Sequence, residues 1–261
     1  MIHRAKKSLG QNFLKSQRAL SQIVMAADIV STDTILEIGP GKGALTERLL
    51  EKAGKVVAVE KDRELVAYLH EKFAKEITEK KLVLIEDDIL EFKNDAIVGT
   101  RYKIVANIPY NITGAIIRKF METKQQPGEM VLLVQKEVAE RIVARDGKES
   151  ILSLSVKAYG MPKYIAKVPA RDFSPAPKVD SAIIAIKNIS RDQLQGISEK
   201  SFFEVLRAGF AHKRKVLIKN LEAIAARDSI NMQFKSLGLS EKIRAEDVPL
   251  EKWLSLSSLI K

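Results

Sequence analysis

The amino-acid sequence predicts an α/β fold with a mostly parallel sheet, an antiparallel last strand, and a small all-helical domain at the C-terminal end. Three observations predict it. Short apolar runs alternate with amphipathic stretches over most of the 261 residues. The apolar runs show no polar face, which is typical of parallel strands covered by helices on both sides. Beyond about residue 190, only helical patterns remain.

The predicted elements follow one another in a regular order. Five strands are expected at residues 34–39, 55–60, 82–87, 103–107 and 130–135. Helices are expected at 43–53, 62–76, 112–122 and 136–145, whereas the segment 89–99 is less regular. The stretch 164–188 holds two strand-like pieces joined by a proline-rich loop, which predicts an antiparallel pair that finishes the sheet.

The rest of the chain predicts a separate helical domain. Its three helical patterns cover residues 198–210, 213–228 and 249–260. We therefore predict two domains, residues 1–190 and residues 191–261.

The composition limits the class of protein. Hydrophobic residues make up 46% of the chain and charged residues 30%, as in globular proteins. No apolar run is long enough to span a membrane, and the basic N-terminal segment lacks a signal-peptide core, so we expect a cytoplasmic protein that does not contact membranes. The chain has no cysteine and only His3, His70 and His212, far apart in the sequence, so we expect no metal site.

The charge indicates a polyanionic partner. The net charge is +11 and the isoelectric point is about 9.6, although solubility alone could account for a moderate excess. Five basic residues precede Asp28, which is the first acidic residue: Arg4, Lys6, Lys7, Lys15 and Arg18. A second cluster, within 211–221, consists of Lys213, Arg214, Lys215 and Lys219. These clusters predict a contact with nucleic acid, without showing which one.

A glycine-rich loop follows the first predicted strand. Gly39, Gly41 and Gly43, followed by Ala44, fit a variant of the dinucleotide-binding loop, although such a loop also occurs as a turn without a ligand. Glu60 ends the second strand about 20 residues later, where an acidic side chain can accept from ribose hydroxyls rather than being an ordinary solvated carboxylate.

The third predicted strand ends in two further acidic residues. Of Asp87 and Asp88, one is expected to accept from an adenine amino group, and the other to cap a turn or face solvent. Together with the glycine loop and Glu60, they predict a pocket for an adenosine group. Both NAD and S-adenosylmethionine carry that group.

The fourth strand ends in the tetrapeptide NIPY, residues 107–110. The amide oxygen of Asn107 can accept from an exocyclic amino group, and the carbonyl of Ile108 or Pro109 can accept its second hydrogen. Tyr110 can stack on a base. The segment could also be a turn with a core tyrosine, but beside an adenosine pocket it favours S-adenosylmethionine over NAD.

The combination of EIGPGKG and NIPY resembles the S-adenosylmethionine-dependent N6-adenine methyltransferases. Four further segments are similar to the ribosomal RNA adenine dimethyltransferases that act on small-subunit (16S-type) rRNA: residues 6–14, 134–144, 173–182 and 210–221. The resemblance spans nearly the whole chain, with one departure: the family usually has Leu where this chain has Ile108. It implies a Rossmann-like methyltransferase domain that dimethylates N6 of two adjacent adenines near the 3′ end of 16S rRNA.

The resemblance also implies roles for individual residues. Asn12 and Leu14 would close over the cofactor, and Gly39 would approach its methionine end. Glu60 would accept from the ribose and Asp88 would accept from the adenine amino group. The expected cofactor-binding set is Asn12, Leu14, Gly39, Gly41, Glu60, Lys61, Asp88 and Asn107.

The implied catalytic group lies around the target base. Phe173 would stack on the target adenine opposite Tyr110, or would be a core aromatic that anchors its loop. The expected catalytic set is Asn107, Pro109, Tyr110 and Phe173. The expected RNA-binding set is Lys213, Arg214, Lys215 and Lys219, on a basic helix.

The expected reaction is direct in-line transfer of a methyl group to N6, with no metal and no covalent nucleophile. The expected partner is 16S rRNA in the small subunit or its precursor, bound by a monomer with a role in subunit biogenesis. One alternative is the macrolide-resistance type of enzyme that methylates 23S rRNA, but the segments 6–14 and 134–144 favour the small-subunit group. The others are a non-catalytic ribosome-assembly or transcription factor on the same scaffold and a nicotinamide dehydrogenase.

Overall fold

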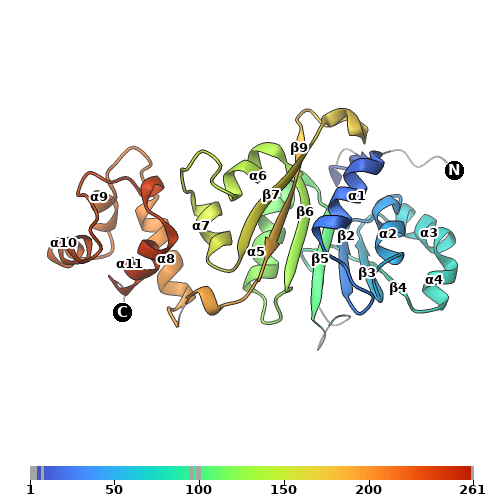
Figure 1. Cartoon of the computed structure of the whole chain (residues 1–261), viewed down its shortest axis with the longest axis horizontal. Coiled ribbons are helices and arrows are strands. Elements are labelled where there is room, and N and C mark those ends of the chain that lie inside the picture. The colour runs from blue at the N-terminus through green and yellow to red at the C-terminus, as the bar shows by residue number, and fades with distance from the viewer. Residues whose placement is uncertain (1–4, 7–8, 94–96, 98–100, 195, 260–261) are drawn as a thin grey trace. The chain divides into compact units, whose positions relative to one another are not determined.

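The structure is a computed structural model that describes residues 5–6, 9–93, 97, 101–194 and 196–259. The chain divides into two compact units (Figure 1). The first comprises Met1–Ala139 and Met161–Ile189, and the second comprises Glu140–Gly160 and Ser190–Lys261. This division differs from the predicted domain limits in one respect, because the segment Glu140–Gly160 groups with the C-terminal helices.

The first unit is built on a twisted sheet. Among the described residues, seven strands form this sheet in the order β4–β3–β2–β5–β6–β9–β7. Strands β2 to β6 run parallel to one another, and β9 runs antiparallel to both β6 and β7. The predicted fold class is therefore confirmed. The strand bounds are β2 Thr34–Ile38, β3 Lys55–Glu60, β4 Leu82–Glu86, β5 Tyr102–Asn107, β6 Glu129–Gln135, β7 Met161–Val168 and β9 Ser181–Lys187.

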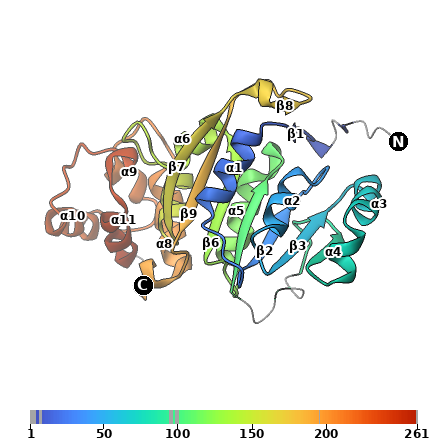
Figure 2. The same ribbon diagram turned by 45° about the vertical axis from the view of Figure 1, so that its right-hand side comes forward.

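A second, two-stranded sheet joins distant parts of the first unit. Strand β1 (Phe13–Leu14) pairs antiparallel with β8 (Phe173–Ser174). Figure 2 shows β1 beside β8 above the main sheet. The N-terminal segment is thus held to the loop between β7 and β9, which is the loop that carries the predicted catalytic Phe173.

Helices lie before, between and after the parallel strands. They are α1 Gln17–Ala26, α2 Ala44–Leu50, α3 Arg63–Lys72, α4 Ala74–Thr78, α5 Thr113–Glu122 and α6 Lys136–Ile142. Short 3₁₀ turns occur at Tyr110–Ile112 and Ala170–Asp172. The helix predicted at 62–76 is two helices, because Phe73 has a non-helical backbone between α3 and α4.

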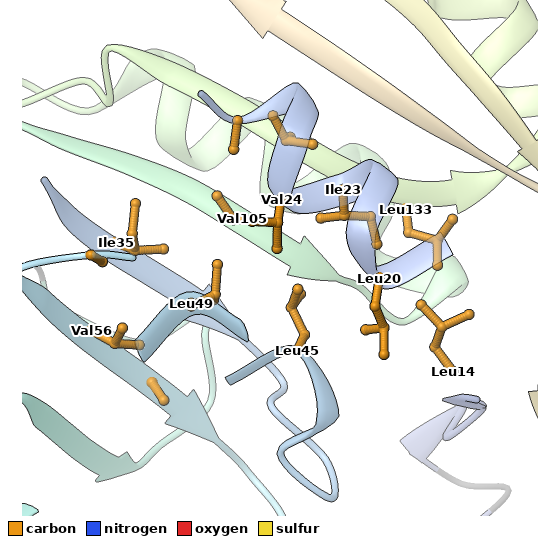
Figure 3. Close-up of a cluster of buried hydrophobic side chains, with 14 of the residues drawn as sticks. Leu14, Leu20, Ile23, Val24, Ile35, Leu45, Leu49, Val56, Val105 and Leu133 are labelled. Carbon is orange, nitrogen blue, oxygen red and sulfur yellow. The ribbon is translucent and has the colours of Figure 1, made fainter. Parts of the chain in front are cut away.

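Helix α1 was not predicted. Its signals are nevertheless present: Ser16 caps it by accepting from the Ala19 N–H at 3.3 Å. Its apolar face packs with α2 against the sheet, as Figure 3 shows for Leu20, Ile23 and Val24. Each of these side chains is at most 5% exposed, so this face is part of the main core.

The second unit is helical in its described residues. The helices are α7 Ile151–Lys157, α8 Glu199–Gly209, α9 Leu217–Leu221, α10 Arg227–Ser236 and α11 Leu250–Leu256, with 3₁₀ turns at Asp192–Leu194, Ala245–Asp247 and Ser257–Leu259. The ring of Trp253 stacks on Phe210. A Cβ at Gly209 would lie 2.3 Å from the Trp253 ring, so α8 and α11 can approach this closely only through glycine.

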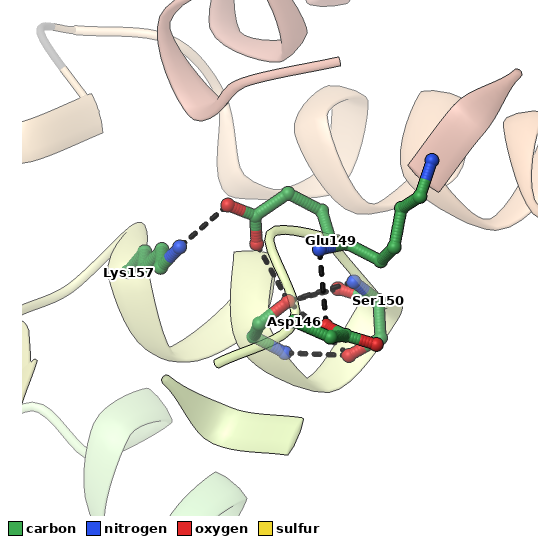
Figure 4. A network of polar contacts seen from close by, with 6 residues as sticks. Asp146, Glu149, Ser150 and Lys157 are labelled. Carbon is green, nitrogen blue, oxygen red and sulfur yellow. Dashed lines mark hydrogen bonds and ion pairs between the residues drawn. The ribbon is translucent and has the colours of Figure 1, made fainter. Parts of the chain in front are cut away.

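The segment before α7 is fixed by a polar network (Figure 4). The Glu149 carboxylate accepts from Lys157 Nζ at 2.5 Å and from the Ser153 hydroxyl at 2.7 Å. Ser150 and Ser153 form a capping box that satisfies the first N–H groups of α7. The preceding helix α6 ends at Ile142, earlier than predicted, because Ala144 adopts a positive φ of 52°.

Candidate functional site

A cavity of about 590 Å³ lies in the first unit at the carboxyl ends of β2, β3 and β5. This is where open α/β sheets bind ligands. Its walls include the glycine loop, the residues that follow β3 and β4, the NIPY segment, and residues 9–15, which we call the N-terminal strap. The predicted site residues that line the cavity are Asn12, Leu14, Gly39, Gly41, Glu60, Lys61, Asp88, Asn107, Pro109 and Tyr110.

The glycine loop has backbone angles that favour glycine. Gly39 has a φ of +64° and Gly41 a φ of +59°. A Cβ at Gly39 would meet no atom within 4 Å, whereas a Cβ at Gly41 would lie 3.0 Å from the Phe13 ring of the strap. The Gly39 N–H donates to the Val59 carbonyl at 2.9 Å, which fixes the loop to β3. The loop therefore offers a close backbone approach to a ligand.

Glu60 ties this loop to the end of β3. It is 6% exposed, and burial raises the pKa of its carboxyl. Its Oε2 accepts from the Gly41 N–H at 3.1 Å, and its Oε1 accepts from the Asp62 N–H at 2.9 Å. The Lys61 N–H also donates to this carboxylate, and because two carboxylate oxygens offer four acceptor positions, one remains for a ligand hydroxyl.

Asp88 and Lys61 form an ion pair at the cavity edge. Lys61 Nζ lies 2.7 Å from Asp88 Oδ2, and Asp88 Oδ1 accepts from the Leu90 N–H at 2.9 Å. The hydrogen bond from Lys61 holds the pKa of Asp88 below its ordinary value. The neighbouring Asp87 accepts from the Asp88 N–H at 2.8 Å, so it supports the local turn.

The side-chain amide of Asn107 has a defined orientation. Its Nδ2 donates to the backbone carbonyl of Asn12 at 3.1 Å. Because a carbonyl only accepts, the other end of the amide, Oδ1, is left as an acceptor. The Pro109 carbonyl accepts from the Ile112 N–H at 3.3 Å, which leaves it a second acceptor position.

The Tyr110 ring is held by a residue that the sequence did not indicate. Its hydroxyl lies 2.5 Å from the hydroxyl of Ser181, at the start of β9. Burial raises the pKa of the Tyr110 phenol, so the hydroxyl stays protonated at neutral pH. Nothing in the spacing of these two residues in the sequence predicts their contact.

Phe173 does not line the cavity. Its ring is 2% exposed and belongs to the hydrophobic core that also includes Leu14, its partner in the β1–β8 pair. The ring would have to leave this position to stack on a base. The stacking role thus stays a prediction.

Most of the basic cluster of the second unit lies in a turn and not in the predicted helix. Lys213, Arg214 and Lys215 occupy an exposed turn before α9, so the prediction of a basic helix there is wrong. Lys219 lies on α9, where it is paired with Glu222 at 3.3 Å. The three residues of the turn form one exposed positive group.

Glu37 is a buried carboxyl that the sequence analysis overlooked. It lies in β2, lines the cavity, and is 1% exposed. Burial raises its pKa from 4.5 to about 8. The sequence does contain a signal for such a group, because an acidic residue inside an otherwise apolar strand is unusual.

Replacing Glu37 with glutamine is expected to change the pH dependence of stability. The raised pKa means that the folded protein retains a proton that the unfolded chain releases between pH 4.5 and about 8. The wild type is therefore expected to lose stability as pH rises through this window, and Glu37→Gln to lose less. Melting temperatures at pH 5 and pH 8.5 measure this, with the exposed Glu71→Gln as control; equal pH profiles for Glu37→Gln and the wild type would contradict it.

The described part of the chain has no candidate membrane span and no candidate metal site. No helix there is long and apolar enough to cross a membrane. Over the same residues, no group of three or more His, Asp or Glu side chains is placed to hold a metal ion.

The sequence matches a family model described as ribosomal RNA adenine dimethylase over residues 2–261. A ribosomal RNA small subunit methyltransferase A from Dehalococcoides mccartyi (strain CBDB1) is 44% identical over 257 residues, which cover 97% of this chain and 87% of the relative. The protein of the same name from Fusobacterium nucleatum is 39% identical over 265 residues, with 100% and 99% covered.

Two solved structures share the fold over nearly the whole chain. A dimethyladenosine transferase from Plasmodium falciparum superposes with a TM-score of 0.80 at 26% identity, covering 94% of this chain and 95% of that one. The 23S rRNA methyltransferase ErmE superposes with a TM-score of 0.79 at 25% identity, covering 95% and 99%.

Proposed function

The chain belongs to the ribosomal RNA adenine dimethylase family, and we propose that it transfers methyl groups from S-adenosylmethionine to N6 of adenines in small-subunit rRNA. One observation carries this proposal. A single cavity combines the glycine loop, Glu60 and Asp88 with the NIPY segment. An adenosine-type cofactor and an adenine amino group therefore share one space.

The residues present fit S-adenosylmethionine. The open backbone at Gly39 has room for a ligand, and the Glu60 carboxylate keeps an acceptor position for a ribose hydroxyl. Asp88, kept ionised by Lys61, can accept from an amino group. The bound cofactor supplies an electrophilic methyl group.

The protein's contribution to the chemistry is to present the target nitrogen correctly. The lone pair of an adenine amino group is delocalised into the ring, so N6 is a weak nucleophile. Asn107 Oδ1 and the Pro109 carbonyl can accept its two hydrogens, which favours a tetrahedral nitrogen with a directed lone pair. These acceptors also stabilise the positive charge that develops on N6. The Asn12 carbonyl holds Asn107 in the required orientation.

Tyr110 provides a face for the target base. Its ring lines the cavity, and the bond to Ser181 fixes its hydroxyl. Base–aromatic stacking contributes about 1–3 kcal/mol, which helps to offset the cost of taking the base out of its stack. A second face from Phe173 is part of the proposal.

Small-subunit RNA is favoured as the substrate over large-subunit RNA. The relatives at 38–44% identity carry the name of small-subunit methyltransferases, whereas the large-subunit enzyme ErmE shares 25%. We extend the proposal to two adjacent adenines near the 3′ end of 16S rRNA, to a cytoplasmic monomer, and to a role in subunit biogenesis.

The proposal is tested with labelled S-adenosylmethionine and small subunits that lack the modification. Digestion to nucleosides is expected to give labelled N6,N6-dimethyladenosine. Sequencing of the RNA would identify which adenines are methylated. A parallel reaction contains unmodified large subunits, and label in their 23S rRNA alone would overturn the choice of substrate. Cofactor binding without any transfer would favour a non-catalytic assembly factor.

The exposed turn is expected to contact the RNA backbone. Changing Lys213, Arg214 and Lys215 together to glutamine should weaken RNA binding. The plot of log affinity against log salt concentration should also become less steep by about 2–3, because each phosphate contact contributes about 0.7–0.9 to the steepness. Filter binding at several salt concentrations measures this slope.

The control for this experiment removes the same charge elsewhere. Lys52, Lys75 and Lys93 are exposed lysines of the first unit, and they are changed together to glutamine. If both triple variants lower the slope equally, the turn has no specific role and only net charge matters.

A further inference from the structure

The N-terminal strap is fastened at its C-terminal end to the β8 loop. Leu14 pairs with Phe173, Phe13 pairs with Ser174, and the Lys15 N–H donates to the Asp172 carbonyl at 2.8 Å. The Leu14 side chain is 7% exposed within the core. This end of the strap is therefore anchored by both backbone bonds and packing.

The other end of the strap is fastened to Asp62, just after β3. Gln11 Nε2 donates to Asp62 Oδ2 at 2.8 Å, and Lys6, which precedes the strap in the sequence, has its Nζ 2.7 Å from Asp62 Oδ1. Lys6 also contacts Glu64 at 3.1 Å, and its backbone N–H donates to Gln11 Oε1 at 2.8 Å. These polar contacts converge on one carboxylate whose side chain is fully inaccessible to solvent.

Asp62 connects this fastening to the cofactor pocket. Its N–H donates to Glu60 Oε1, and Glu60 Oε2 accepts from the Gly41 N–H. A continuous path of hydrogen bonds thus runs from Gln11 through Asp62 and Glu60 to the glycine loop. Asp62 Oδ1 also accepts from the Glu64 N–H at 3.1 Å, which starts helix α3.

Helix capping alone does not account for this arrangement. A cap needs one acceptor oxygen, which is Oδ1, whereas Oδ2 is directed to the strap. Burial alone would raise the pKa of Asp62, but the bonds from Lys6 and Gln11 outweigh it and hold the pKa below its ordinary value. The carboxylate therefore remains charged, and its bonds to the strap are charge-assisted.

The strap covers groups that the reaction needs. The Phe13 ring lies over Gly41, and the Asn12 carbonyl orients the amide of Asn107. Asn12 lies between the two fastened ends, and Phe13 belongs to the end that pairs with β8. Release at Asp62 would therefore free one side of the cavity and loosen the hold on Asn107.

We propose that Asp62 is a positioning residue that acts as a catch, holding the strap closed over the cavity and thereby slowing the departure of the cofactor. This inference rests on the proposed function, since it takes the cavity to hold S-adenosylmethionine. It adds Asp62, Gln11 and Lys6, which have no part in the methyl transfer itself, as determinants of cofactor residence.

The test compares Lys6→Met, Lys6→Arg and Asp62→Asn with the wild type. Amide hydrogen exchange of residues 9–13 is measured without ligand, and dissociation of S-adenosylhomocysteine is followed by stopped flow. We expect Lys6→Met and Asp62→Asn to exchange faster in the strap and to release the product about 10-fold faster, which matches the loss of a hydrogen bond to a charged group. Lys6→Arg, which keeps the charge, should behave like the wild type.

Steady-state kinetics separate a catch from a general loss of structure. For Lys6→Met the KM for S-adenosylmethionine should rise by a larger factor than kcat falls, and exchange in β6 should match the wild type. This variant removes the cation but keeps the bond from Gln11 to Asp62 and the helix cap that Asp62 forms. The catch would be overturned if Lys6→Met released S-adenosylhomocysteine at the wild-type rate, or if amide hydrogen exchange in its strap were unchanged. Failure of the wild type to bind S-adenosylhomocysteine would instead overturn the proposed function.

Discussion

Replacing Asn107 with alanine is expected to lower kcat about 100- to 1000-fold, as the loss of one preorganised polar group at a reacting centre typically does. The variant loses the Oδ1 acceptor for the N6 hydrogens and also the Nδ2 donor that binds Asn12. RNA affinity should stay within about 2-fold, because Asn107 carries no charge that could neutralise a phosphate. Single-turnover methyl transfer and filter binding measure the two quantities separately.

Asn107→Asp separates the two functions of the amide. Aspartate keeps an oxygen acceptor for the target amino group but cannot donate to the Asn12 carbonyl. We expect a smaller loss of kcat than in Asn107→Ala, together with a raised KM for the cofactor as the strap is repelled. Asn231→Ala, an exposed asparagine on α10, is the control. Equal loss of RNA binding and methyl transfer in Asn107→Ala would contradict the role assigned to the amide.

The part of the site that the sequence predicts is the part made of local patterns. The glycine loop follows β2, Glu60 and Asn107 are the last residues of β3 and β5, and the apolar strands are easy to recognise. Since parallel strands end at one edge of the sheet, residues after these strands must lie close together. The glycine loop, Glu60, Asp88 and NIPY all line the cavity.

The contacts that fasten the site could not be predicted. Gln11 and Asp62 are 51 residues apart, and Tyr110 and Ser181 are 71 residues apart. Each pairing depends on how segments far apart in the sequence come together in the folded chain. No periodic pattern in the sequence predicts such a contact. The position of Phe173 has the same cause, since its burial depends on the pairing of β8 with β1.

The basic segment shows tertiary structure overriding helix propensity. Residues 213–228 have the composition of one helix, yet the chain forms a turn before α9 and another after it. The buried Asn220 side chain donates to the Gly209 carbonyl at 2.6 Å and to the His212 carbonyl at 3.2 Å, which holds the first turn. Such bonds outweigh the few tenths of a kcal/mol per residue that propensity contributes.

Replacing Glu60 with glutamine is expected to raise the KM for S-adenosylmethionine about 10- to 100-fold. The carboxylate accepts from Gly41 and Asp62 and would accept from the ribose, whereas a glutamine side chain has only one oxygen. One N–H or hydroxyl would therefore lose its partner, and a hydrogen bond to a charged group contributes about 1.5–3 kcal/mol. Equilibrium binding of S-adenosylhomocysteine measures the loss directly.

Thermal unfolding distinguishes this loss of affinity from a loss of structure. Glu60→Gln leaves one backbone N–H without its acceptor, but it also removes a buried carboxyl whose pKa burial raises, so the ligand-free variant should melt only slightly below the wild type. Saturating cofactor stabilises a protein in proportion to the logarithm of its affinity, so the ligand-induced rise should be smaller in Glu60→Gln. The exposed Glu71→Gln should behave like the wild type in both measurements. If the cofactor raised the melting temperature of Glu60→Gln as much as that of the wild type, this carboxylate would not contact the cofactor.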